Sequence, residues 1–323
     1  MRATRRNPPR WWVLGPSVAA LVVVIVVLAT RWAAVTASQP AYLVTLLVVA
    51  TAALGGVGWS SVGLGHGRAP DRSRARVLTA RALGILGTVV LVLAMLWLRP
   101  LPATGVAVAA MSGSAAVRVT APTSQIELDP TAGSTRTGLI FYPGALVDPR
   151  AYVPHLSILA AAGFPVVIVK PPCGIAFLSS GAASGAVAAH PSIARWVVGG
   201  HSLGGVVASA NAGAGQSRID GLLLWAYYPN GSIAGGTSLE VTSVSAGNDG
   251  LATPAKIAAS EPYLPPATRF VVVEGAVHAD FGDYGTQRGD GTPTTGRAEA
   301  QAQIEEASLA LLQRVDERRG TGT

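Results

Sequence analysis

The residues Gly200 to Gly204, with the sequence GHSLG, match the G-x-S-x-G nucleophile elbow. A short β-branched and aromatic run, 195–199, precedes them, and a Gly/Ala/Val-rich segment that can form a helix, 203–212, follows. At such a tight strand-to-helix turn the serine takes strained backbone angles, and only glycine fits on either side. Because the chain holds 38 glycines, an ordinary Gly-rich turn is the competing interpretation. The flanking pattern favours Ser202 as a nucleophile.

His278 and Asp249 are the candidate partners of Ser202. A serine hydroxyl becomes a good nucleophile when a base takes its proton and a carboxylate orients that base. At elbows of this kind the chain order is serine, then acid, then histidine, and His278 is the single histidine that follows the serine in the chain. The five histidines are His66, His155, His190, His201 and His278.

The carboxylate has rivals. Asp249 lies in the turn Gly-Asn-Asp-Gly that follows an expected strand, a position where pure turn chemistry is the alternative. Asp280 and Asp283 lie on the same loop as His278, too close in the chain to reach the far imidazole nitrogen easily. Asp249 is therefore the predicted acid, and a surface histidine in a Gly/Asp-rich loop remains the alternative for His278.

An oxyanion formed at the substrate carbonyl needs two preorganised N–H donors. We expect one from Leu203, directly after the nucleophile. The other is expected from the Pro143-Gly144-Ala145 turn after a buried strand, with Ala145 as first choice and Gly144 as second. A plain Pro-Gly turn is the alternative here.

Apolar strands alternate with Ala/Gly-rich helical stretches from about residue 104 to the end. A hairpin is expected at 117–120 and 125–129, buried strands at 138–142, 164–170, 195–199, 221–228, 240–246 and 269–273, and helices at 149–162, 254–260 and 297–318. Continuous apolar strands alternating with helices predict an α/β domain, 104–323, with a mostly parallel sheet covered on both faces. Ligands then bind at the carboxyl ends of the strands.

The first 103 residues are different. Apolar runs at 13–30, 41–59 and 82–98 are each long enough to cross a bilayer as a helix. We therefore expect a membrane region, 1–103, with three transmembrane helices. The alternatives are buried core helices and, for the first run, a cleaved signal peptide.

Arginines indicate the orientation of these helices. Four precede the first run, five lie between 68 and 81, and only Arg31 lies between the first and second runs. Since basic loops stay in the cytoplasm, we expect the α/β domain on the extracytoplasmic face of the cell membrane.

Composition excludes several functions. The first 103 residues hold 11 of the 24 basic and one of the 17 acidic residues, so the rest carries 13 basic against 16 acidic residues. The basic pI thus belongs to the membrane region, and the C-terminal domain gives no reason to propose nucleic-acid binding. A single cysteine, Cys173, which we expect to be a small buried hydrophobe, excludes an internal disulfide and a Cys-based zinc site. Scattered histidines and the lack of a dinucleotide or P-loop motif predict neither metal nor cofactor.

Four separated motifs resemble the α/β-hydrolase superfamily, within roughly 115–315: FYPGALVDP at 141–149, GGHSLGG at 199–205, GNDG at 247–250 and HADFGDYG at 278–285. They are most similar to a bacterial branch distantly similar to dienelactone hydrolases and carboxylesterases. The resemblance implies an eight-stranded sheet and a triad of Ser202, Asp249 and His278. The nucleophile is Ser where dienelactone hydrolases have Cys, so their substrate is not carried over.

These observations predict a membrane-anchored serine hydrolase that cleaves an ester-type bond, a carboxylic ester or thioester, through an acyl-enzyme. Its partners would be a small-molecule or lipid-like ester and the lipid bilayer. Tyr227 and Tyr228, at the end of an expected strand, line the acyl pocket or pack in the core. The alternative function is a catalytically silent binding or membrane-scaffold protein that keeps the same fold.

Overall fold

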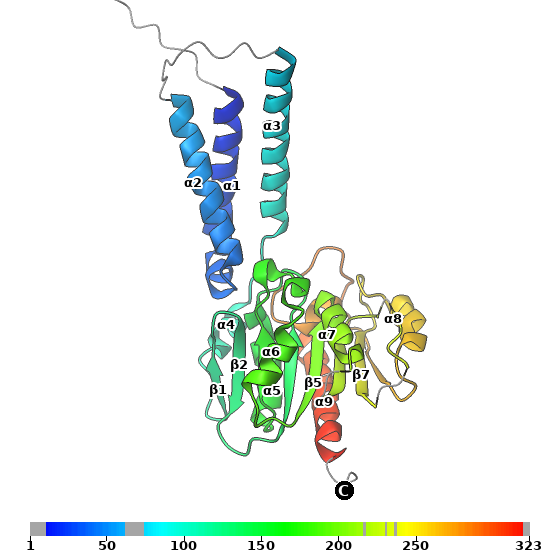
Figure 1. The fold of residues 1–323 in the computed structure, drawn as a ribbon. Coiled ribbons are helices and arrows are strands. Elements are labelled where there is room, and N and C mark those ends of the chain that lie inside the picture. The colour runs from blue at the N-terminus through cyan, green and yellow to red at the C-terminus, as the bar shows by residue number, and fades with distance from the viewer. Residues whose placement is uncertain (1–10, 62–73, 216–217, 230, 236–237, 319–323) are drawn as a thin grey trace, which may run out of the picture. The chain divides into compact units, whose positions relative to one another are not determined.

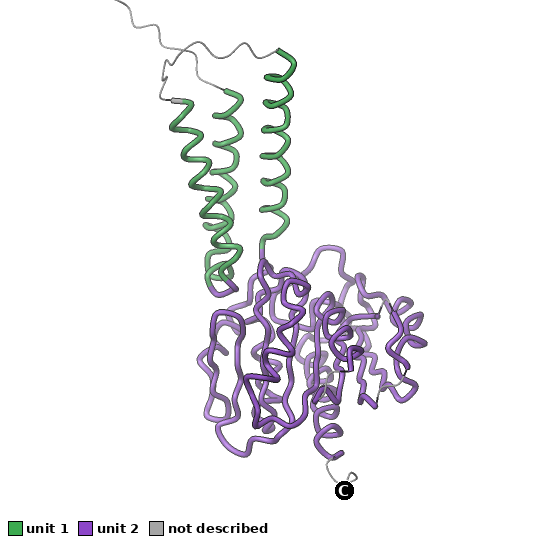
Figure 2. The backbone as a smooth tube through the Cα atoms, in the orientation of Figure 1, with its two compact units in different colours: residues 1–36, 40–99 green, residues 37–39, 100–323 purple. Residues whose placement is uncertain are grey.

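The computed structural model describes residues 11–61, 74–215, 218–229, 231–235 and 238–318. The chain divides into two compact units, Met1–Thr36 with Pro40–Arg99 and Ala37–Gln39 with Pro100–Thr323 (Figure 2). Most of the arginines that indicate the orientation of the helices, at 2–10 and at 68 and 72, lie outside the described residues.

The described residues of the first unit form three helices, α1 (Trp11–Ala37), α2 (Ala41–Ser61) and α3 (Arg74–Trp97). All three are long and apolar enough to cross a membrane. Each extends beyond the apolar run in the sequence, and α1 bends at Arg31, whose φ of −132° is not helical. Tyr42 of α2 donates its hydroxyl to the carbonyl of Met95 in α3 at 2.7 Å, so buried polar contacts join helices within this unit.

The second unit contains an eight-stranded sheet in the order β1-β2-β4-β3-β5-β6-β7-β8 (Figure 1). The strands are β1 (Val117–Thr120), β2 (Gln125–Pro130), β3 (Thr137–Tyr142), β4 (Val166–Val169), β5 (Arg195–His201), β6 (Ile219–Trp225), β7 (Glu240–Ala246) and β8 (Arg269–Val273). β1 and β2 are antiparallel, β2 joins β4 antiparallel, and the remaining pairs are parallel. The predicted mostly parallel α/β sheet is confirmed.

Helices cover both faces of the sheet, as continuous apolar strands require. α5 (Val153–Ala161) and α9 (Arg297–Glu317) contribute to the core on one face, and α6 (Ala182–Ala189) and α7 (Leu203–Gly213) to the core on the other. Figure 1 shows α7 in front of the strands and α9 behind them. The short helices α4 (Gly105–Ala110) and α8 (Pro254–Ser260) complete the unit.

Several element bounds differ from the prediction; for example, the strand expected at 164–170 is β4, which covers only Val166–Val169. The helix expected at 149–162 begins as a 3₁₀ turn, Pro149–Tyr152, and becomes α-helical only in α5. β6 ends at Trp225, earlier than expected, because Ala226 adopts a positive φ of 45° that interrupts the extended backbone. Tyr227 and Tyr228 therefore follow the strand.

Candidate active site

Ser202 lies at the sharp turn between β5 and α7. Its φ of 51° and ψ of −121° are a strained conformation for a residue with a side chain. The glycines around it are explained by close approach: a Cβ on Gly200 would be 2.3 Å from the carbonyl carbon of Gly204, and one on Gly204 would be 2.1 Å from the carbonyl oxygen of Tyr142. The turn is held further by the Ser202 N–H, which donates to the carbonyl of Trp225 at 2.9 Å. The half-buried serine is thereby presented at the carboxyl end of β5.

Asp249 and His278 lie together on the loops after β7 and β8. The Nδ1 atom of His278 is 2.8 Å from Asp249 Oδ2, and both side chains are buried. The other oxygen, Asp249 Oδ1, accepts the backbone N–H groups of Leu251 and Ala252, each at 2.7 Å. Because a carboxylate only accepts, this arrangement favours the His278 tautomer with the proton on Nδ1 and a lone pair on Nε2.

The ring of His278 lies next to the elbow. Its centroid is 4.6 Å from the ring of His201, the residue before the serine. Nε2 of His278 is buried, and it has no hydrogen-bond partner in the described parts of the chain. The structure thus brings the histidine and its acid to the elbow, with no hydrogen bond between the described Ser202 hydroxyl and the ring in this state. Catalytic hydrogen bonds are often long without substrate.

Backbone N–H groups near Ser202 provide the candidate oxyanion donors. The N–H of Gly144 donates to the Tyr152 hydroxyl at 2.9 Å and is therefore already used. Within the described residues, no hydrogen bond engages the N–H of Ala145 or that of Leu203, at the start of α7. Ala145 and Leu203 thus stay the predicted pair of oxyanion donors.

Tyr152 holds the loop after β3 through its hydrogen bond with the N–H of Gly144. Its buried hydroxyl also lies 2.8 Å from Nδ1 of His201, so one phenol joins the loop after β3 to the elbow strand. Burial lowers the pKa of His201 well below its ordinary value, and the neighbouring His278 lowers it further. His201 is therefore neutral near pH 7 and serves as packing under Ser202, where it stacks on Phe281 with ring centroids 5.6 Å apart.

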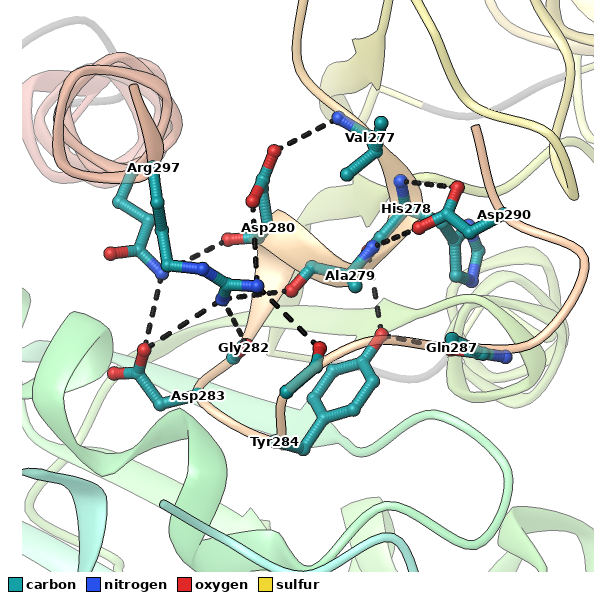
Figure 3. A network of polar contacts seen from close by, with 12 residues as sticks. Val277, His278, Ala279, Asp280, Gly282, Asp283, Tyr284, Gln287, Asp290 and Arg297 are labelled. Carbon is teal, nitrogen blue, oxygen red and sulfur yellow. Dashed lines mark hydrogen bonds and ion pairs between the residues drawn. The ribbon is translucent and has the colours of Figure 1, made fainter. Parts of the chain in front are cut away.

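Asp290 holds the backbone that carries His278 (Figure 3). Its Oδ1 accepts the N–H of His278 at 3.1 Å and that of Gly250 at 3.3 Å, and its Oδ2 accepts the N–H of Ala279 at 2.8 Å. Gly250 is next to Asp249 in the chain. One carboxylate thereby ties the histidine loop to the loop of the acid.

Arg297, at the start of α9, holds the same loop from the other side (Figure 3). Its Nη1 donates to the carbonyls of Ala279 and Gly282 at 3.1 and 3.0 Å. It also lies 3.6 Å from Asp280 and 3.9 Å from Asp283. The two rival acids thus belong to this support: Asp280 Oδ2 accepts the Val277 N–H at 2.9 Å, and Asp283 pairs with His155 at 3.2 Å.

The sequence did not point to Tyr152, Asp290 or Arg297. Tyr152 lies 50 residues before the serine, and Arg297 begins a helix. Neither residue belongs to a recognisable sequence motif. Asp290, between Gly289 and Gly291, had the weak signal of a Gly-Asp-Gly turn. Their roles depend on contacts between loops that are distant in sequence.

The structure also places Tyr227 and Cys173, two residues singled out from the sequence. Tyr227 is buried and packs on the first turn of α7, where a Cβ on Gly205 would be 2.5 Å from its ring. Core packing, one of the two alternatives, is thus what Tyr227 does. The expectation that Cys173 is buried is wrong: it is half-buried, in the short 3₁₀ turn Pro172–Gly174 with a positive φ of 52°. Its partial burial raises the pKa of the thiol.

No group of three or more His, Cys, Asp or Glu side chains among the described residues is placed to hold a metal ion. The loops at the elbow bring together a serine, an imidazole, a carboxylate and backbone N–H groups.

A family model agrees with this architecture. Residues 138–303 match the family model described as "Alpha/beta hydrolase family". No curated protein matches the chain. Among solved structures, the crystal structure of TT1662 from Thermus thermophilus is similar, with 16% sequence identity and a TM-score of 0.45 over 63% of this chain and 99% of that chain.

Proposed function

This chain belongs to the α/β-hydrolase family, and from that premise we propose that it is a membrane-anchored serine hydrolase that cleaves a carboxylic ester or thioester. The family and the eight-stranded sheet support a hydrolase-type function. The finer assignment rests on the loops after β3, β5, β7 and β8.

The observation that carries the proposal is the buried hydrogen bond between His278 Nδ1 and Asp249 Oδ2 at 2.8 Å. It orients the ring and leaves Nε2 as the basic atom, beside the strained elbow that presents Ser202. A histidine that serves only as core packing needs neither a carboxylate bonded to Nδ1 nor an Nε2 without a hydrogen-bond partner. A base for a serine hydroxyl needs both.

The proposed reaction has two halves. Ser202 Oγ attacks the ester carbonyl while His278 Nε2 takes its proton, and the N–H groups of Ala145 and Leu203 bind the oxyanion. His278 then gives the proton to the leaving alcohol or thiol, which forms the acyl-enzyme. Water, deprotonated by His278, hydrolyses the acyl-enzyme and frees Ser202, while Asp249 stabilises the imidazolium in each half.

The location is part of the proposal. In the part of the chain that the structure describes, three helices are long and apolar enough to span a membrane, and the arginine pattern favours an extracytoplasmic catalytic domain. The substrate is then a small-molecule or lipid-like ester that reaches this face of the membrane. To test the orientation, a reporter is fused after Thr323. Reporter activity found only in the cytoplasm would contradict the extracytoplasmic location, but not the proposed hydrolase reaction.

The test is hydrolysis of esters of graded acyl chain length by the full-length protein in detergent, compared with Ser202→Ala. We expect turnover to fall by about 10⁶ in the variant if the triad acts as a unit. Equal hydrolysis by both proteins overturns the assignment of Ser202. A folded wild type that hydrolyses no ester and reacts with no serine-directed probe favours the catalytically silent scaffold instead.

A further inference from the structure

The segment Leu101–Thr104, here called the linker segment, follows α3 in the chain and belongs to the second unit. We propose that it is a positioning element of the active site, which holds the loop Pro143–Asp148, here called the oxyanion loop, in its working conformation. This inference rests on the proposed function and deepens it.

The linker segment pairs with the oxyanion loop as a short parallel bridge. Leu101 donates its N–H to the carbonyl of Leu146 at 2.7 Å and accepts the N–H of Asp148 at 2.9 Å, so its two bonds flank Val147. The N–H of Ala103 adds a weaker contact to Asp148 Oδ2 at 3.4 Å. Asp148 is itself buried and fixed by Arg150 at 2.7 Å, so the bridge is anchored to a rigid point.

The bridge acts on a strained residue. Leu146 has a φ of 61°, in the left-handed region that a leucine rarely adopts. Its N–H donates to the carbonyl of Gly174 at 2.9 Å, and its carbonyl accepts from Leu101, so hydrogen bonds hold it from both sides. A strained residue keeps its conformation only where its surroundings force it to. The Leu101 N–H is one of these two restraints.

Leu146 directly follows Ala145, whose N–H is a proposed oxyanion donor. Such a donor works at 2.7–3.1 Å from the developing oxyanion, and a displacement of about 1 Å can cost roughly 100-fold in rate. Losing the restraint on Leu146 would therefore weaken transition-state binding more than substrate binding.

The linker segment also reaches the histidine loop. The N–H of Thr104 donates to the carbonyl of Asp283 at 2.8 Å, five residues after His278. In turn, the N–H of Asp283 donates to the carbonyl of Ala151 at 2.8 Å. One short segment thus bonds to the loops of both the oxyanion donor and the catalytic base.

The test compares Leu101→Pro with Leu101→Ala in the full-length protein. Proline removes the N–H donor, whereas alanine keeps it and removes the side chain. We expect kcat of Leu101→Pro to fall at least about 10-fold below that of Leu101→Ala, with KM within about twofold. Hydrogen exchange of the peptide covering 143–148 is expected to be faster in the proline variant.

Gly105→Pro is the matched proline control. Gly105 begins α4, a Cβ there meets no atom within 4 Å, and Thr104 before it has the extended ψ of 169° that proline tolerates. We expect wild-type kcat and exchange from this variant. If Leu101→Pro does not fold, Thr104→Pro replaces it. Thr104 has a φ of −72°, which suits proline, and this variant loses the N–H that donates to Asp283. We expect a lower kcat for Thr104→Pro than for Thr104→Ala.

The outcomes separate this inference from the proposed function. An active wild type whose proline and alanine variants share the same kcat and the same exchange overturns the positioning role alone. A wild type without any esterase activity overturns the proposed function, and the positioning role with it.

Discussion

His278 Nδ1 lies 2.8 Å from Asp249 Oδ2, although 29 residues separate them in the chain. The first prediction concerns this pair. In Asp249→Asn the amide keeps the size of the side chain, but it can present an N–H to the ring and stabilise the wrong tautomer. We expect kcat for ester hydrolysis to fall by about 10⁴.

Asp280→Asn is the matched control, since Asp280 lies two residues after His278 and contacts backbone and Arg297, not the imidazole. Its retained amide oxygen can still accept the Val277 N–H, so kcat should stay within a few-fold of wild type. Equal losses in the two variants would contradict the assignment of Asp249 as the orienting acid.

The second prediction concerns Asp290, which accepts the N–H groups of both His278 and Ala279. Asp290→Ala leaves these donors without their acceptor and frees the histidine loop. We expect kcat to fall about 10- to 100-fold with a smaller change in KM, measured by steady-state kinetics. Asp129→Ala, which removes an aspartate from β2, next to the edge strand β1, should leave kcat unchanged. An Asp290→Ala enzyme with wild-type kcat would refute the positioning role.

The third prediction concerns the elbow glycines. In Gly204→Ala the new Cβ would lie 2.1 Å from the carbonyl oxygen of Tyr142, so the turn must shift. We expect a loss of about 1–3 kcal/mol in the free energy of unfolding, as for overpacked cores, together with loss of activity. Gly185→Ala in α6 meets no atom within 4 Å, so it should be neutral or gain about 0.5–1 kcal/mol. Thermal melting distinguishes the two, and equal stability would contradict the close-packed turn.

The sequence predicts those parts of the site whose residues lie next to one another in the chain. The elbow is encoded within five residues, because strand, turn and helix are contiguous, and the α/β sheet follows from apolar runs that the structure confirms. Ser202, Asp249 and His278 stay predictions as catalytic residues, but their order in the chain was enough to select them.

Contacts between distant loops could not be predicted. Tyr152 bonds to Gly144 and His201, and Asp290 to His278 and Gly250, only because the β3, β5, β7 and β8 loops meet at one edge of the sheet. The pairing of Leu101 with the oxyanion loop could not be predicted either, because it consists of backbone hydrogen bonds, which do not depend on the type of side chain.

The fourth prediction is a pH dependence of stability. Burial alone would lower the pKa of His155, but the carboxylates of Asp283 at 3.2 Å and Glu305 at 2.9 Å outweigh it and raise that pKa. A raised pKa in the folded state stabilises the fold fully below the unfolded value of about 6.5, and this contribution is lost as the pH rises through the folded value.

We therefore expect the apparent Tm of the wild type, followed by near-UV circular dichroism in detergent, to fall as the pH rises above about 6.5. His155→Gln should lose this part of the dependence. The pKa of Asp283 is lowered because its pairing with His155 outweighs its burial, so its own contribution is lost only at acid pH. A His155→Gln melting curve that follows the wild type at every pH would contradict the buried ion pair.

The central claim is that Ser202 is a nucleophile activated by His278. The most direct measurement is reaction of the full-length protein with a fluorophosphonate, followed by mass-spectrometric mapping of the adduct in the wild type and in Ser202→Ala. We predict one adduct, on the peptide containing Ser202, absent from the variant and formed much more slowly in His278→Ala. A folded wild type that forms no adduct, or labelling that persists in Ser202→Ala, would contradict the account.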